Sequence, residues 1–456
     1  MNSNDLVALN LIWVVTSATL GLATILGLLL QALASRPARQ SGKVMPTMIL
    51  CLASGLLGYL ACGFAFQFGG VREALPSLGK LELLGREWAP LRNSFGPGWG
   101  LLGLDGFFLA GAGRDMGVYA LFYVQSALML TAMAVATLPL AVWAKPPALV
   151  GYSLFFGSFL YPLIGNWAWG GGWLSQLGSS LKLGHGYVDY AGSGLVQAAG
   201  GLAALAGALI LGTGKSRPHP SPLPEGEGPG EGSALGHRPE NGPLAAIGLV
   251  IVFLGWTALV LSNTLAVDKA VIALVMTNVL LAAAGGSAAS ASYMAFTTGR
   301  LVWHYPVRGL LAGAVAVSAA GPFISPVMAV LVGAVAGLLM CAADFLLVMV
   351  LKGYDRFGAI SLHGSSGLWG VVAVALVANG RYGQGWNGVG ERSYLSVAGQ
   401  GVSGLLVSAG LRPDPTQFVA QALGVATLFI WSFGLTWLFF KVWDALWGLG
   451  SRLADN

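Results

Sequence analysis

The sequence predicts an all-α integral membrane protein with about eleven transmembrane helices, because of its composition and its pattern of apolar blocks. Of the 456 residues, 55% are hydrophobic and 9% are charged, whereas soluble globular chains carry roughly 25% charged residues. The apolar blocks are long enough to cross a bilayer core of about 30 Å, which takes about 20 residues of helix. Backbone groups in such blocks must bond within the block, so helix is the expected conformation.

The predicted spans follow one another along the chain, and their limits are those of the apolar blocks. They lie at residues 6–34, 44–68, 116–142, 147–166, 189–213, 243–263, 270–296, 308–326, 327–351, 358–380 and 415–446. No basic stretch precedes the first block, so we expect a retained helix there rather than a signal peptide. An odd number of spans places the termini on opposite sides. The Lys and Arg residues of the short loops favour an outer N-terminus and a cytoplasmic C-terminus.

A cut between the fifth and sixth spans leaves two halves of five spans and one further helix. Because five is odd, the two halves must have opposite orientations in the membrane. We therefore expect a single membrane domain over residues 1–456, built as an inverted five-plus-five repeat with an extra C-terminal helix. The halves show no clear sequence identity, so this repeat is an architectural prediction.

The segment at residues 214–243 separates the two halves. It reads GKSRPHPSPLPEGEGPGEGSALGHRPENGP and has almost no apolar residues to bury. We expect a disordered cytoplasmic loop. Its two histidines, His219 and His237, have no third ligand or cysteine nearby, which favours solvated side chains over a metal site.

The most specific motifs lie at the ends of three spans. Residues 161–174 read YPLIGNWAWGGGWL, residues 189–200 read DYAGSGLVQAAG, and residues 357–367 read FGAISLHGSSG. A proline, a tryptophan and a glycine triplet closing one span, then an acid opening the next, resemble the Amt/MEP/Rh ammonium transporter family. The third stretch is similar to that family's phenylalanine, glycine and histidine-glycine pattern. The chain is identified as a divergent bacterial member.

This resemblance implies a function and an assembly. It implies that an ammonium-type cation crosses the bacterial cytoplasmic (inner) membrane through a pore in each protomer of a homotrimer, in contact with membrane lipid. The fifth and tenth spans are expected to line that pore. A cytoplasmic PII-type regulator is a further partner that the resemblance suggests.

Asp189 and Trp169 are the predicted residues of the outer mouth. A carboxylate at the start of a span costs free energy unless it is paired or bonded. As a helix cap, Asp189 would satisfy free N–H groups, and its charge would also favour an arriving cation. The two roles are compatible, and the resemblance implies both. Trp169 matches the family's recruitment-site tryptophan, and a cation over such a ring gains roughly 0.5–2 kcal/mol.

Gln197 and His363 are the predicted residues of the middle of the pore. Gln197 lies eight residues after Asp189, or about 12 Å deeper along a helix. In the resembled family this position usually carries the first of two pore histidines, and His363 matches the second. An amide cannot exchange a proton near neutral pH as an imidazole can, so a relay along two histidines is in doubt. Gln197 could equally serve as a hydrogen-bonding contact between helices.

The remaining candidates surround the outer mouth. Four aromatic residues could face a cation there, although each could also belong to an interfacial aromatic belt: Phe122, Tyr123, Trp167 and Trp256. The family has two stacked phenylalanines that close the pore below the recruitment site and a serine beside the tryptophan. By approximate alignment those positions hold Ser126, Leu259 and Asn263. Such a gate would be less aromatic and wider.

Other classes of function find no support in the sequence. It has no phosphate-binding loop, nucleophile elbow or paired carboxylates, so we expect neither an enzyme nor a cofactor. The charges are spread over short loops, which does not favour a nucleic-acid partner. Two alternatives to ammonium transport stay open. One is an ammonium sensor with little transport, and the other is a carrier of a larger quaternary organic cation.

The loop generates a first testable prediction. We expect a short Gly/Ser linker in place of residues 214–243 to leave folding and transport intact, because this composition cannot support a packed core. Size-exclusion chromatography and currents from reconstituted liposomes would check it. Loss of the assembly or of the current would show that the segment has an ordered role.

Overall fold

The computed structural model describes residues 3–35, 38–71, 75–79, 81–96, 99–211, 241–267, 271–351, 355 and 357–449. Within these residues, 11 helical stretches are long and apolar enough to cross a membrane. They are Asp5–Ala34, Val44–Phe68, Met116–Leu140, Pro146–Trp169, Ser193–Leu211, Gly242–Ser262, Val271–Thr298, His304–Phe323, Pro326–Met349, Ala359–Val377 and Thr416–Trp447. The all-α membrane fold and the predicted number of spans are confirmed.

Many spans consist of several helical segments, some of them short π-helical or 3₁₀ turns, labelled η. The first five spans and their loops contain α1 (Ser3–Gly21), α2 (Ala23–Ala34), α3 (Ala38–Gly58), η1 (Tyr59–Gly63), α4 (Phe64–Phe68), η2 (Pro76–Leu78), β1 (Glu87–Trp88), α5 (Arg92–Phe95), β2 (Leu102–Gly103), η3 (Phe107–Leu109), α6 (Met116–Thr137), η4 (Leu138–Leu140), α7 (Pro146–Phe155), η5 (Phe156–Leu160), α8 (Tyr161–Trp169), α9 (Leu177–Leu181), η6 (Ser193–Ala198) and α10 (Ala199–Leu211).

The second half has fewer interruptions. It contains α11 (Gly242–Ser262), α12 (Val271–Thr298), α13 (His304–Ala320), η7 (Gly321–Phe323), α14 (Pro326–Leu351), η8 (Ala359–Gly364), α15 (Ser365–Val377), β3 (Ser393–Tyr394), β4 (Val397–Ala398), α16 (Thr416–Leu428), η9 (Phe429–Phe433) and α17 (Gly434–Trp447). Both strand pairs are antiparallel, β1 with β2 and β3 with β4.

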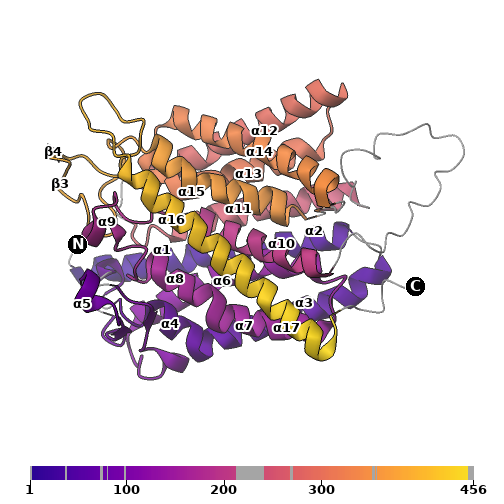
Figure 1. Ribbon diagram of the computed structural model, residues 1–456, viewed down its shortest axis with the longest axis horizontal. Helices are drawn as coiled ribbons and strands as arrows, with labels where there is room; N and C mark the ends of the chain where they lie inside the picture. The colour runs from indigo at the N-terminus through magenta and orange to yellow at the C-terminus, as the bar shows by residue number, and fades with distance from the viewer. Residues whose placement is uncertain are drawn as a thin grey trace, which may run out of the picture.

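The helices lie side by side along the long axis of the molecule (Figure 1). α1 begins at the end of the bundle that carries α9, β3 and β4, and α17 finishes at the opposite end. An odd number of crossings requires this arrangement. We call the first end the hairpin end and the other the far end.

Small residues bring neighbouring helices into close contact. α12, α13 and α14 pack on one another, and a methyl group on Gly333 would lie 1.9 Å from the carbonyl oxygen of Ala282. Only glycine allows the two backbones to approach this closely, as is common between membrane helices.

The predicted disordered loop falls outside the described residues, except for its last three, and these require a correction. Asn241 caps α11, because its side chain accepts the N–H of Leu244 at 3.1 Å. Asparagine is among the favoured caps, and Pro243 suits the first turn of a helix. The helix therefore begins at Gly242, and a linker that replaces the loop has to stop at residue 240.

Candidate functional site

A fully buried carboxylate holds the turn from which the fifth span starts. Asp189 Oδ1 accepts the N–H of Gly192 at 3.1 Å, and Oδ2 accepts those of Gly194 and Leu195 at 3.0 and 2.8 Å. Gly192 has φ +88°, a left-handed conformation that favours glycine. The Tyr187 hydroxyl donates to Oδ2 at 3.4 Å. The predicted start of the fifth span at residue 189 is thus four residues early, because residues 189–192 form this turn and the helix begins at Ser193.

The charge of Asp189 has no counter-ion among the described residues. Burial raises the pKa of Asp189 to about 6, and bonds from backbone N–H groups lower it in part. The carboxyl is therefore mainly ionised at neutral pH. Its charge lies at the N-terminal end of a helix, where the dipole stabilises an anion. The result is a fixed negative charge beneath the hairpin end.

The indole of Trp169 lies beside this turn. Its Nε1 donates to the main-chain carbonyl of Asp189 at 2.7 Å, and its ring is partly exposed. Trp167 is placed differently: its Nε1 donates to the carbonyl of Leu101 at 2.9 Å, and its ring packs edge-on against Trp431 with centroids 4.6 Å apart. Trp169 is therefore partly accessible beside this turn, whereas Trp167 ties the outer loop to the helices.

The start of the tenth span repeats the turn at the far end. Asp355 Oδ1 accepts the N–H of Ala359 at 2.9 Å, and Oδ2 accepts those of Ile360 and Ser361 at 2.8 and 2.7 Å. Gly358 has φ +68°, so this turn also uses a left-handed glycine. Asp355 was not among the predicted residues.

The two turns share one spacing in the sequence. In each turn, glycine is the third residue after the acid and a polar residue is the eighth. The polar residue is Gln197 after Asp189 and His363 after Asp355. α10 packs against η8 and α15 packs against η6, so the fifth and tenth spans cross near their first turns. This spacing, repeated at opposite ends, supports the inverted repeat.

Gln197 and His363 meet where the two halves cross. His363 Nδ1 lies 2.5 Å from Gln197 Oε1, and both side chains are buried. An amide oxygen only accepts, so His363 Nδ1 carries the proton of this bond. In the neutral imidazole Nε2 then has a lone pair. The arrangement fixes the tautomer of the ring.

An ion pair inside the membrane spans supports the second turn. The Arg308 guanidinium on α13 donates to both carboxylate oxygens of Asp344 on α14, at 2.6 and 3.0 Å, and to Ser361 Oγ at 2.7 Å. Ser361 Oγ in turn donates to Asp355 Oδ2 at 2.9 Å. Charged residues in apolar spans are rare, so Arg308 and Asp344 could have been identified from the sequence.

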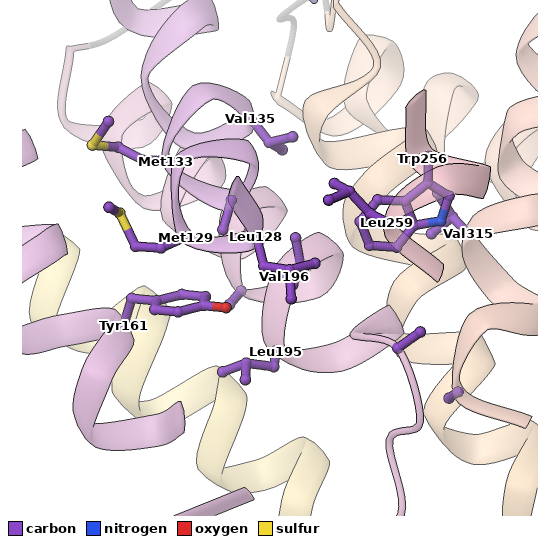
Figure 2. Packing of buried hydrophobic residues seen from close by; sticks show 14 of the residues in the cluster. Leu128, Met129, Met133, Val135, Tyr161, Leu195, Val196, Trp256, Leu259 and Val315 are labelled. Atoms are coloured by element: carbon purple, nitrogen blue, oxygen red, sulfur yellow. The ribbon is translucent and has the colours of Figure 1, made fainter. Parts of the chain in front are cut away.

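Two predicted mouth residues lie in the apolar core instead. Trp256 is fully buried, and its Nε1 donates to Ser318 Oγ at 3.0 Å. Leu259 is also fully buried, and a methyl group on Gly21 would lie 2.4 Å from its Cδ2. In Figure 2 Leu259 and Val315 lie on either side of the Trp256 ring, and all three belong to the buried cluster. They pack α11 against α1 and α13, and Leu259 does not stand free at a gate.

The other predicted residues make separate contacts. Phe122 stacks on Tyr59 with centroids 5.7 Å apart, and the Tyr123 hydroxyl lies 3.0 Å from Thr19 Oγ1. Asn263 Nδ2 donates to the carbonyl of its own helix at residue 259, at 3.0 Å. Ser126 Oγ is buried and has no hydrogen-bond partner among the described residues. The structure thus joins Trp169 with Asp189 and Gln197 with His363, while a ligand role for the others stays a prediction.

The fold and the paired turns define a polytopic membrane transporter of the inverted-repeat class. The model of the Ammonium Transporter Family matches residues 12–453, so the chain belongs to that family.

Relatives of known name agree with this assignment. The chain is 28% identical to ammonium transporter Amt2 of Archaeoglobus fulgidus over 412 residues, which cover 89% of this chain and 77% of that protein. It is 26% identical to the ammonium transporter of Bacillus subtilis over 418 residues, which cover 87% of this chain and 91% of that protein.

Solved structures share the fold. One described as a sensor Amt protein has a TM-score of 0.77 and 24% identity, with 100% of this chain and 97% of that chain covered. Mep2 of Candida albicans has a TM-score of 0.72 and 19% identity, with 96% of this chain and 85% of that chain covered.

The Asp189 turn generates a second prediction. Asp189→Ala is expected to abolish transport and to weaken the fold, because each buried N–H left unpaired costs about 1–3 kcal/mol. Asp115→Ala is a matched control, since Asp115 also caps a helix, through the N–H of Val118 at 3.3 Å, but lies apart from this turn. It is expected to lose a cap, about 0.5–2 kcal/mol, together with the bond that its Oδ2 accepts from the N–H of Glu82 at 3.2 Å, and to remain active. Thermal unfolding in detergent and liposome currents would check both, and full activity of Asp189→Ala would remove Asp189 from the mechanism.

The ion pair generates a third prediction. Arg308→Gln leaves the Asp344 carboxylate, whose side chain is 14% exposed, without its cation, which is expected to cost up to about 3–5 kcal/mol of the free energy of unfolding. The double variant Arg308→Gln/Asp344→Asn removes both charges and is expected to recover much of that loss. Thermal unfolding of the single and double variants would measure this. A double variant as unstable as the sum of the two single variants would contradict the pairing.

Proposed function

We propose that this protein carries ammonium, or a methylated ammonium cation, across the membrane through a path between its two halves. One observation carries the proposal: in a chain of the ammonium transporter family, two acid-capped turns at opposite ends bring Gln197 and His363 together in the buried middle of the spans. Buried polar side chains at the crossing of two discontinuous helices are typical of a substrate path.

The residues divide into two stages along that path. At the hairpin end, the charge of Asp189 attracts a cation, and the partly exposed ring of Trp169 stabilises it by roughly 0.5–2 kcal/mol. The bond from Trp169 to the Asp189 carbonyl fixes the ring over this end. Deeper, the Nε2 lone pair of His363 can accept a hydrogen bond from a substrate N–H. Gln197 cannot pass on a proton, so the pair works as an acceptor and its brace rather than as a relay of two imidazoles.

We further propose that the hairpin end faces outward, in the cytoplasmic (inner) membrane of a bacterium. The similarity to a bacterial ammonium transporter and the distribution of Lys and Arg in the short loops support this orientation and membrane. Exposed apolar side chains on α12 and α14, such as Leu280, Phe296 and Val327, suit contact with lipid or with other subunits. A homotrimer and a PII-type regulator at the far end stay predictions from the family resemblance.

The sensor remains a second candidate. It is favoured by the similarity to the sensor Amt protein over the whole of this chain. Transport of a larger quaternary cation also stays a prediction. One of its premises was a wider gate at Leu259. Leu259 is fully buried and packs against Gly21, so the expected wider gate at this residue gains no support from its contacts.

A fourth prediction separates these candidates. Purified protein in liposomes on a solid-supported membrane is expected to give a current after an ammonium pulse, a smaller one after methylammonium and none after tetramethylammonium. Empty liposomes and the Asp189→Ala variant are the controls. Ammonium binding in calorimetry without current would favour the sensor. Tetramethylammonium currents larger than those of ammonium would contradict the proposal and favour the larger-cation carrier.

A further inference from the structure

A short segment at residues 185–188 leads directly into the Asp189 turn and belongs to no helix or regular strand. We call it the lead-in segment. All of its residues are buried, so each backbone N–H and C=O needs a partner within the protein. Nearby main-chain carbonyls accept two of the N–H groups, that of Gly186 at Leu183 and that of Tyr187 at Leu174. The remaining groups depend on side chains from other parts of the chain.

Two glutamines of the eleventh span bond to the lead-in segment. α16 begins at the hairpin end (Figure 1). Its Gln417 Oε1 accepts the N–H of His185 at 2.8 Å, and Nε2 donates to the carbonyl of Gly186 at 2.9 Å. One turn further on, Gln421 Oε1 accepts the N–H of Val188 at 2.8 Å, and Nε2 donates to the carbonyl of the same residue at 2.7 Å. Each amide therefore pairs with the main chain through donor and acceptor together, as a neighbouring strand does.

An asparagine of the outer loop bonds to the other carbonyls of the lead-in segment. Asn387 Nδ2 donates to the carbonyls of His185 and Tyr187, at 3.0 and 3.1 Å. With these bonds, every backbone N–H and C=O of the segment has a partner. The segment is thus held by three amide side chains that lie from 200 to 233 residues away in the sequence.

Gln421 links the lead-in segment to a third element. Its Nε2 also donates to the carbonyl of Val371 on α15, at 2.9 Å, so both hydrogens of the amide are used by main-chain carbonyls. The next residue after Val188 is Asp189, whose own carbonyl accepts the bond from the Trp169 indole. Because buried groups are closely packed, a displacement of Val188 is passed on to Asp189 and to the indole.

We propose that Gln421, together with Gln417, is a positioning residue that places Asp189 and Trp169 for the capture of a cation at the hairpin end. The identity of that cation rests on the proposed function, whereas the positioning does not. Gln421 has no free polar hydrogen for a ligand, so it acts through the turn. Groups that orient a binding residue from behind typically change affinity about 10–100-fold in metal sites.

Substitution by methionine tests the proposal, because methionine keeps the length of the side chain but removes the amide. Gln421→Met is expected to raise the ammonium concentration that gives half the maximal current about tenfold or more. The maximal current is expected to stay within about twofold of the wild type, since the deeper residues are unchanged. A merely structural loss would instead lower the amount of folded protein, and with it the maximal current, at an unchanged half-maximal concentration.

Gln400→Met is the matched control. Gln400 is also fully buried, and its amide also makes three hydrogen bonds, one with Ser403 and two with Arg412. These bonds lie within the outer loop. The half-maximal concentration of this variant is expected to stay within about twofold of the wild type.

A second readout does not depend on transport. The indole N–H resonance of Trp169, assigned with Trp169→Phe in solid-state NMR of the reconstituted protein, reports the bond to the Asp189 carbonyl. Gln421→Met is expected to shift this resonance, and Gln400→Met to leave it unchanged. If Gln421→Met does not fold, Gln417→Met is expected to give the same changes at a smaller size, because its bonds lie further from the turn.

Three results would overturn the proposal: an unchanged half-maximal concentration in the folded α16 variants, an unchanged indole resonance in them, or equal changes in the Gln400→Met control. A wild type without ammonium current, but with the indole shift in Gln421→Met, would overturn the proposed function and leave the positioning role intact.

Discussion

The buried carboxylate of Asp189 fixes the turn from which the fifth span starts, and the rest of the proposed path depends on that turn. Backbone N–H groups at a helix start have no partner within the helix. Three of them bond to this one side chain, within 3.1 Å. This turn also sets the position of Gln197, eight residues after Asp189. The main-chain carbonyl of Asp189 accepts the hydrogen bond from the Trp169 indole.

The same unit is used twice, and the two copies differ in chemistry. Asp355 sets the tenth span in the same way at the far end, with Arg308 and Asp344 bracing it from α13 and α14. One copy then presents an amide and the other an imidazole. The amide oxygen of Gln197 accepts a hydrogen bond and does not gain or lose a proton near neutral pH. The tautomer of the His363 ring is therefore fixed, and the two side chains cannot exchange a proton symmetrically. The path therefore has a direction at its centre even though its frame is built from a repeat.

Much of this arrangement could be predicted from the sequence, for identifiable reasons. Composition determines the spans, and the residues at 169, 189, 197 and 363 lie in motifs with strong local constraints. Asp355 was missed because its turn shares with the first only an acid, a glycine and a polar residue at matching spacing, which is a weak signal in one sequence. Trp256 and Leu259 were misplaced because α11 is apolar on all sides, so no periodicity tells which face meets α1 and α13.

The tautomer of His363 tests the account most directly. Solid-state ¹⁵N NMR of the reconstituted protein near neutral pH, with His363→Ala to assign the resonances, reports which ring nitrogen carries hydrogen. The account predicts a neutral ring with hydrogen on Nδ1 and a bare Nε2. A neutral ring protonated on Nε2 would show that Gln197 does not accept from His363 and would contradict the central pair. An imidazolium would contradict the bare Nε2.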